Sequence, residues 1–186
     1  MKKLFVLICF MLSTSLNAAE MQNIGTINFE NSGAQEAQEH FQRGVAILHS
    51  FGWKQAISEF RAAQRIDPDF AMAYWGESLC YNHPLIPEQD RASPTAALER
   101  LGKDLEERLQ KAPTDREKGF VMAVEALFIT KGSIAERRIA YKNEMQRLYS
   151  RYQDDEVSTF YALSLLSAAG ASGDERMGMN VLAGSI

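Results

Sequence analysis

Cysteine is scarce in this chain of 186 residues, which has only Cys9 and Cys80. Cys9 lies in the N-terminal apolar run Leu4–Leu12, which we expect to be removed, so the mature chain has no intramolecular disulfide. That run is too short to cross a bilayer as a mature helix. No block of basic residues interleaves with aromatics, so we expect no nucleic-acid partner.

Enzyme motifs are lacking too. The sequence has no nucleophile elbow, no H-E-x-x-H metal motif and no glycine-rich phosphate loop. Ser50 follows His49, but that is adjacency in sequence only. Hydrophobic residues make up 46% and charged residues 24%, as in ordinary globular domains. We therefore predict a folded protein that is not an enzyme and has no cofactor.

The N-terminus has the order of a secretory signal. Lys2 and Lys3 precede the apolar run, and small residues follow it up to Ala19. Residues 1–19 are therefore predicted to be a cleaved signal peptide of a periplasmic or secreted protein, the alternative being a retained membrane anchor. Residues 20–33 are polar, contain two glycines and have no clear period, so they are predicted to form a flexible lead-in.

The rest of the chain predicts an all-α fold. Strand-like alternation is absent, helix formers dominate, and Gly and Pro occur mainly between periodic segments. Proline at residue 68 ends one segment firmly. Thr114 and Glu117 have the spacing of a capping box. The expected helices cover residues 34–50, 54–66, 70–82, 95–111, 114–130, 133–152 and 155–169, and an eighth begins near residue 174.

A 34-residue period fits the first helical pair. In a unit that begins at residue 37, small, aromatic and proline residues fall at the places where two helices must approach, fill the space between them and stop: Gly44, Ala56, Phe60, Ala63 and Pro68. This pattern resembles the tetratricopeptide repeat (TPR), although His40 stands where that family has an aromatic residue.

The resemblance implies helix–turn–helix repeats that form a right-handed α-solenoid over residues 34–186. The best-matched repeat covers 37–70. A second covers 71–113 with a loop insertion at 83–94, and degenerate pairs cover 114–154 and 155–186. The runs His49–Phe51, Ala71–Gly76 and Asn82–Leu85 also resemble exported bacterial TPR-containing proteins. Those chains usually continue well past this length and have later segments rich in histidine, so the resemblance implies a chain truncated at its C-terminus or a short variant.

In TPR folds the first helices of successive repeats line a concave groove. By position, the resemblance assigns the groove to Gln38, Phe41, Val45, Leu48, His49, Met72, Trp75, Leu79, Asn82 and His83. An apolar, aromatic groove suits a peptide with apolar anchors. The alternative is that Phe41, Trp75 and Leu79 are core residues packed between repeats.

His49 and His83 are 34 residues apart and so share one place in consecutive repeats. Two imidazoles on neighbouring helices could hold a metal ion if Asn82, Glu88 or Asp90 completed the ligands. The alternative is that each histidine caps its own helix end, where a cation is favoured.

Two further expectations concern single residues and charge runs. Cys80 lies in an apolar pattern, which favours a buried small hydrophobe over a reactive thiol. The charge runs Asp104–Arg108 and Asp115–Lys118 are predicted to be solvated helix faces.

Three functions stay open. The first is a scaffold that binds a protein or peptide in the groove. The second is a metal-dependent site, possibly enzymatic, built on His49 and His83 and completed by C-terminal sequence. The third is a structural subunit that self-associates through an uncapped C-terminal end, where Met177, Leu182 and Ile186 are apolar.

Overall fold

The computed structural model describes residues 25–84, 90–170 and 176–186. Over these residues the chain forms nine α-helices, one short 3-10 helix and no strand, so the all-α prediction is confirmed. The elements are η1 (Gln35–Ala37), α1 (Gln38–His49), α2 (Trp53–Ile66), α3 (Ala71–Leu79), α4 (Ala92–Leu101), α5 (Leu105–Gln110), α6 (Asp115–Phe128), α7 (Ile134–Tyr149), α8 (Asp155–Ala169) and α9 (Arg176–Ala183).

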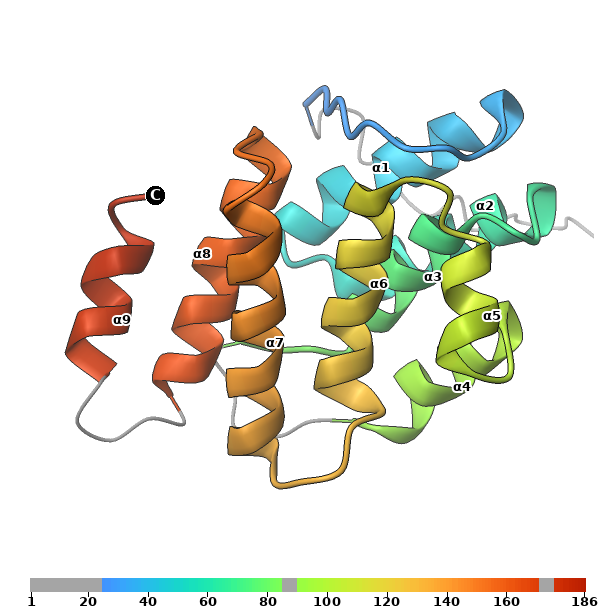
Figure 1. Ribbon diagram of the computed structural model, residues 1–186. Helices are drawn as coiled ribbons and strands as arrows, with labels where there is room; N and C mark the ends of the chain where they lie inside the picture. The colour runs from blue at the N-terminus through green and yellow to red at the C-terminus, as the bar shows by residue number, and fades with distance from the viewer. Residues whose placement is uncertain (1–24, 85–89, 171–175) are drawn as a thin grey trace, which may run out of the picture.

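Helices that follow one another in the chain pack side by side. This holds for α1 with α2, α2 with α3, α6 with α7, α7 with α8 and α8 with α9 (Figure 1). Helix α6 also packs against α3, and α5 packs against α6. The contact between α3 and α6 therefore joins the first three helices to the last four.

Small residues let the first three helices approach. The ring of Phe60 on α2 lies between Gly44 on α1 and Gly76 on α3. A Cβ atom at Gly44 would lie 2.9 Å from that ring, and one at Gly76 would lie 2.4 Å from it. Ala56 and Ala63 on α2 are fully buried. Close approach therefore depends on the absence of side chains at the two glycines.

The predicted capping box at the start of α6 is confirmed. The Thr114 hydroxyl accepts from the backbone N–H of Glu117 at 3.1 Å. The Glu117 carboxylate accepts from the backbone N–H of Thr114 at 3.3 Å. These bonds satisfy two of the N–H groups that a helix start leaves without a partner.

The single helix predicted over residues 95–111 is wrong, because two helices cover this part of the chain. Helix α4 begins earlier, at Ala92, with Pro94 in the first turn, where a missing N–H is tolerated. Gly102 has extended backbone and ends α4. Asp104 then caps α5 by accepting from the N–H of Glu107 at 2.9 Å. A glycine followed by a good N-cap residue explains the break.

The two predicted solvated charge runs each contain a buried residue. Arg108 is 3% exposed and lies 2.5 Å from the carboxylate of Glu125 on α6. Burial raises the pKa of Glu125, although the charge of Arg108 opposes that rise. Glu117 is 1% exposed. The prediction was wrong at these positions because the partners lie on other elements, which near-neighbour spacing does not reveal.

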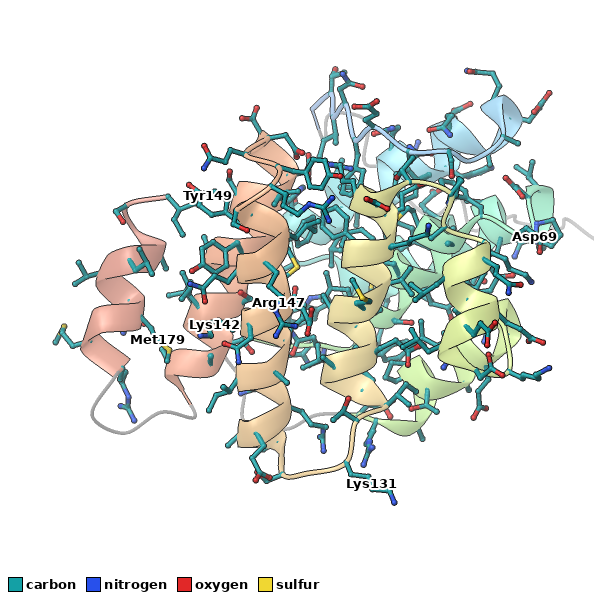
Figure 2. All side chains as sticks on the ribbon, viewed as in Figure 1. Asp69, Lys131, Lys142, Arg147, Tyr149 and Met179 are labelled. Carbon is teal, nitrogen blue, oxygen red and sulfur yellow. The ribbon has the colours of Figure 1, made fainter. Side chains whose placement is uncertain are left out.

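Cys80 is buried at the end of α3, and burial raises the pKa of its thiol. At the other end of the chain, Met179 on α9 lies toward α8 and packs against the core (Figure 2). Met177 and Val181 on the same helix are 73% and 66% exposed. No helix among the described residues has the length and apolarity needed to cross a membrane. The predicted signal peptide lies outside the described residues.

Gly76→Ala should destabilise the fold by about 1–3 kcal/mol, because the new methyl group would overpack against Phe60. Thermal or urea unfolding measures this loss. Gly178→Ala is the matched control, since no atom lies within 4 Å of the position on α9. A Gly76 variant as stable as this control would contradict the proposed packing.

Candidate functional site

The predicted groove residues on α1 and α3 are buried. Phe41, Val45, Met72 and Trp75 have no exposed surface, and Leu48, Leu79 and Asn82 are 5–7% exposed. Only Gln38, His49 and His83 are partly exposed. Of the predicted groove residues, Phe41 and Trp75 form the floor of a surface that another segment covers.

The cover is the N-terminal end of the described chain. Residues 25–34, here called the strap, run along α1 toward η1 and pass the start of α6 (Figure 1). The Phe29 ring is fully buried, and its centroid lies 5.4 Å from that of Phe41, 5.4 Å from Trp75 and 5.2 Å from Phe120. The part of the predicted flexible lead-in that is described thus follows a defined path, because this one aromatic residue buries its side chain.

Side-chain amides hold the strap backbone. Gln42 on α1 donates to the Phe29 carbonyl at 2.9 Å and accepts from the Phe29 N–H at 3.0 Å. Gln38, one turn earlier, donates to the Gly33 carbonyl at 2.8 Å. It also exchanges two hydrogen bonds with the amide of Asn31, at 2.8 and 2.9 Å. Amides that both donate and accept suit a backbone, which offers both kinds of group.

The first turn of α6 provides charged contacts. One oxygen of the buried Glu117 carboxylate accepts from the N–H and the hydroxyl of Ser32, at 2.8 and 2.7 Å. Arg116 donates to the Glu30 carbonyl at 2.9 Å. Its guanidinium also lies 4.7 Å from the ring centroid of Phe29, the geometry of a cation–π contact.

Asp154, the N-cap of α8, fixes the orientation of Arg116. Both carboxylate oxygens accept from the guanidinium, at 2.8 and 2.9 Å. Burial acts to raise the pKa of Asp154, but the hydrogen bonds from Arg116 and from the backbone N–H of Val157 outweigh it, so the pKa lies below its usual value. The carboxylate is therefore ionised at neutral pH and holds the cation over the strap.

The end of the strap enters the fold at a crowded point. A Cβ atom at Gly33 would lie 2.5 Å from the Phe70 ring, so only glycine fits there without movement. The next N–H, at Ala34, donates to the Asp67 carboxylate at 2.8 Å. Beside the strap lies a cleft of about 330 Å³ lined by Glu30, Asn31, Ser32, Thr114, Arg116, Tyr152 and Asp154.

His49 and His83 have different neighbours. The Nε2 atom of His49 lies 2.8 Å from a Glu156 carboxylate oxygen, and its ring stacks on Phe160. The His83 ring lies 4.0 Å, centroid to centroid, from Trp53. Among the described residues no group of three or more His, Cys, Asp or Glu side chains could hold a metal ion.

Of the two acidic residues considered as further metal ligands, only Asp90 lies among the described residues. Asp90 accepts from the N–H of Ser93 at 3.1 Å, and Glu88 lies outside the described residues.

The residues that hold the strap were missed by sequence reasoning, apart from Gln38. Phe29 is a single aromatic residue in a polar segment with no period, and Gln42 lies on a helix face that the repeat pattern does not mark. One signal was available for Glu117, because its capping-box role places it at a helix start, where a carboxylate can also accept from another segment.

Comparison with known proteins gives no relative: no family model, no curated protein and no solved structure matches the chain.

Phe29→Ala should lower the free energy of unfolding by about 3–5 kcal/mol, because it empties the space between three buried rings. Phe51→Ala is the control, since the Phe51 side chain is 49% exposed and its removal should cost under about 1 kcal/mol. Urea unfolding followed by circular dichroism compares the two. Equal effects would mean that the strap does not contribute to the core.

Asp154→Asn should destabilise the chain more at pH 7 than at pH 3. A carboxylate whose pKa is lowered on folding adds stability above its unfolded pKa of about 3.9 and loses it as the pH falls through the folded value. Because the side chain is 42% exposed, solvent screening limits the difference to about 0.5–1 kcal/mol. Asparagine keeps an N-cap acceptor for the N–H of Val157, but its NH₂ group replaces one of the two oxygens that accept from Arg116.

Thermal unfolding of wild type and variant at both pH values measures this difference. Asp69→Asn, at a carboxylate that is 75% exposed, serves as the control. A loss of the same size at pH 3 would show that the charge of Asp154 is not its cause.

Proposed function

We propose that this protein is an exported TPR-like repeat scaffold that binds an extended segment of another protein in the groove formed by α1, α3 and α6. The single observation that carries the proposal is the way in which the strap is held. Five side chains bond its backbone carbonyl or N–H groups, and none of these bonds depends on the identity of the strap's own side chains: Gln38, Gln42, Asp67, Arg116 and Glu117. A surface with this arrangement can hydrogen-bond the backbone of an extended peptide whatever side chains the peptide carries.

The apolar floor supports the same proposal. The rings of Phe41, Trp75 and Phe120 surround one aromatic side chain on three sides. In extended-peptide recognition, main-chain hydrogen bonds give affinity and side-chain pockets give specificity. Here Gln38, Gln42 and Arg116 supply the hydrogen bonds to the main chain. The pocket formed by the three aromatic rings supplies the specificity for a side chain.

The repeat resemblance fits this use of the fold. Gly44, Ala56, Phe60 and Ala63 pack in the roles that the TPR pattern assigns to their places. In such folds the first helices of the repeats face the ligand, and α1 and α3 are the helices on which the strap lies. Export to the periplasm or outside the cell is part of the proposal and rests on the signal-like N-terminus.

The test is a selection of ten-residue peptides, each with a central aromatic residue, on the full chain and on its Phe29→Ala variant. Selected peptides should bind at least about tenfold more weakly to Gln42→Ala combined with Phe29→Ala than to Phe29→Ala alone, because the second change removes two backbone-directed hydrogen bonds. Lys131→Ala, in the exposed turn between α6 and α7, should leave binding unchanged (Figure 2). Fluorescence anisotropy measures affinity. The proposal fails if no selected peptide depends on Gln42.

A further inference from the structure

We propose that the strap is an intramolecular ligand, and that the partner displaces it with a segment of the same pattern: an aromatic residue, any residue, asparagine, serine or threonine, then glycine. This inference rests on the proposed function and specifies its partner. It follows from what each strap position contacts.

The first two positions differ in what they demand. Phe29 has no exposed surface and packs against three rings, so its counterpart must be aromatic. Glu30 contributes its backbone carbonyl to Arg116, while its side chain is exposed. Any residue therefore fits at the second position.

The third position demands an amide. Asn31 donates to the Phe29 carbonyl at 2.7 Å and accepts from the Gly33 N–H at 3.0 Å, which bends the strap. It also pairs with the Gln38 amide through two hydrogen bonds, one in each direction. Aspartate is acceptor-only when ionised and cannot make the donating half of this set.

The last two positions are limited by a buried charge and by space. Glu117 uses one carboxylate oxygen for its own capping box and offers the other to Ser32. With the strap removed, that buried oxygen has lost two donors, and a hydroxyl on the incoming segment restores one. Gly33 faces the Phe70 ring at a distance that excludes a Cβ atom.

The strap is attached in a way that permits exchange. Among the described residues, no backbone-to-backbone hydrogen bond joins positions 25–33 to a helix, so release breaks only side-chain contacts. The cleft of about 330 Å³ lies along its outer edge, where Glu30 and Ser32 are exposed. A partner segment can therefore begin to bind there before Phe29 leaves its place.

The experiment uses a fluorescein-labelled peptide with the sequence of residues 26–35 and measures its affinity for the full chain by anisotropy. Wild type should bind it weakly, because its own strap competes at high effective concentration. Phe29→Ala should bind it at least about tenfold more tightly, since weakening the internal ligand raises the population of the open groove. Phe29→Leu, which keeps an apolar side chain, should be intermediate and serves if the alanine variant does not fold.

Control peptides test the pattern. Replacing the phenylalanine, the serine or the glycine of the peptide by alanine should each reduce affinity for Phe29→Ala by about tenfold or more, whereas replacing the glutamate should not. Gln42→Ala combined with Phe29→Ala should also reduce it.

Two outcomes overturn the inference. One is equal affinity for wild type and folded Phe29 variants. The other is no binding of the strap peptide to those variants while selected peptides still bind in a Gln42-dependent way, which would leave the proposed function standing. Absence of any Gln42-dependent peptide would remove the proposed function as well.

Discussion

The packing of aromatic rings around Trp75 is the interaction on which the groove depends. Its ring contacts Phe29 from the strap, Phe120 from α6 and Phe160 from α8, with centroids 4.9–5.4 Å apart. These partners come from distant parts of the sequence, so one buried side chain holds together segments that local helix propensity cannot align. Because aromatic contacts have preferred geometries, this cluster fixes the width of the groove as well as its stability.

Folding and binding share residues at the start of α6. Glu117 completes the capping box of its own helix and also accepts from Ser32. Arg116, its neighbour, joins the N-cap of α8 to the strap backbone. A substitution of either residue therefore affects both helix capping and the contacts in the groove. Gln42, in contrast, forms hydrogen bonds with the strap and with Gln38, so its substitution affects the strap without affecting the capping of α6 or α8.

Much of the helical layout could be predicted from the sequence, because its signals are local. Pro68 follows the end of α2, and Thr114 with Glu117 begins α6, as the pattern of residues predicts. The break at Gly102 was not predicted, since a glycine inside a helical run is often tolerated and the cap at Asp104 decided the outcome.

The site was less accessible to sequence reasoning. The TPR resemblance assigned Phe41, Trp75 and Leu79 to a groove, and these side chains are buried. What covers Phe41 and Trp75, the Phe29 ring, lies in a segment without any period. Periodicity shows which face of a helix is apolar but does not show which distant segment covers it. The pairing of His49 with Glu156, more than a hundred residues away in the chain, is hidden for the same reason.

The burial of Cys80 has a consequence for the reactivity of its thiol. It is the one cysteine among the described residues, it is 1% exposed at the end of α3, and burial raises the pKa of its thiol. A thiolate reacts and a buried thiol does not. The ring contacts and hydrogen bonds of the strap are made with residues other than Cys80, so we expect its departure to leave this sulfur covered. The rate at which Cys80 is alkylated therefore reports how often the helices themselves separate. This rate should be the same whether or not a segment occupies the groove.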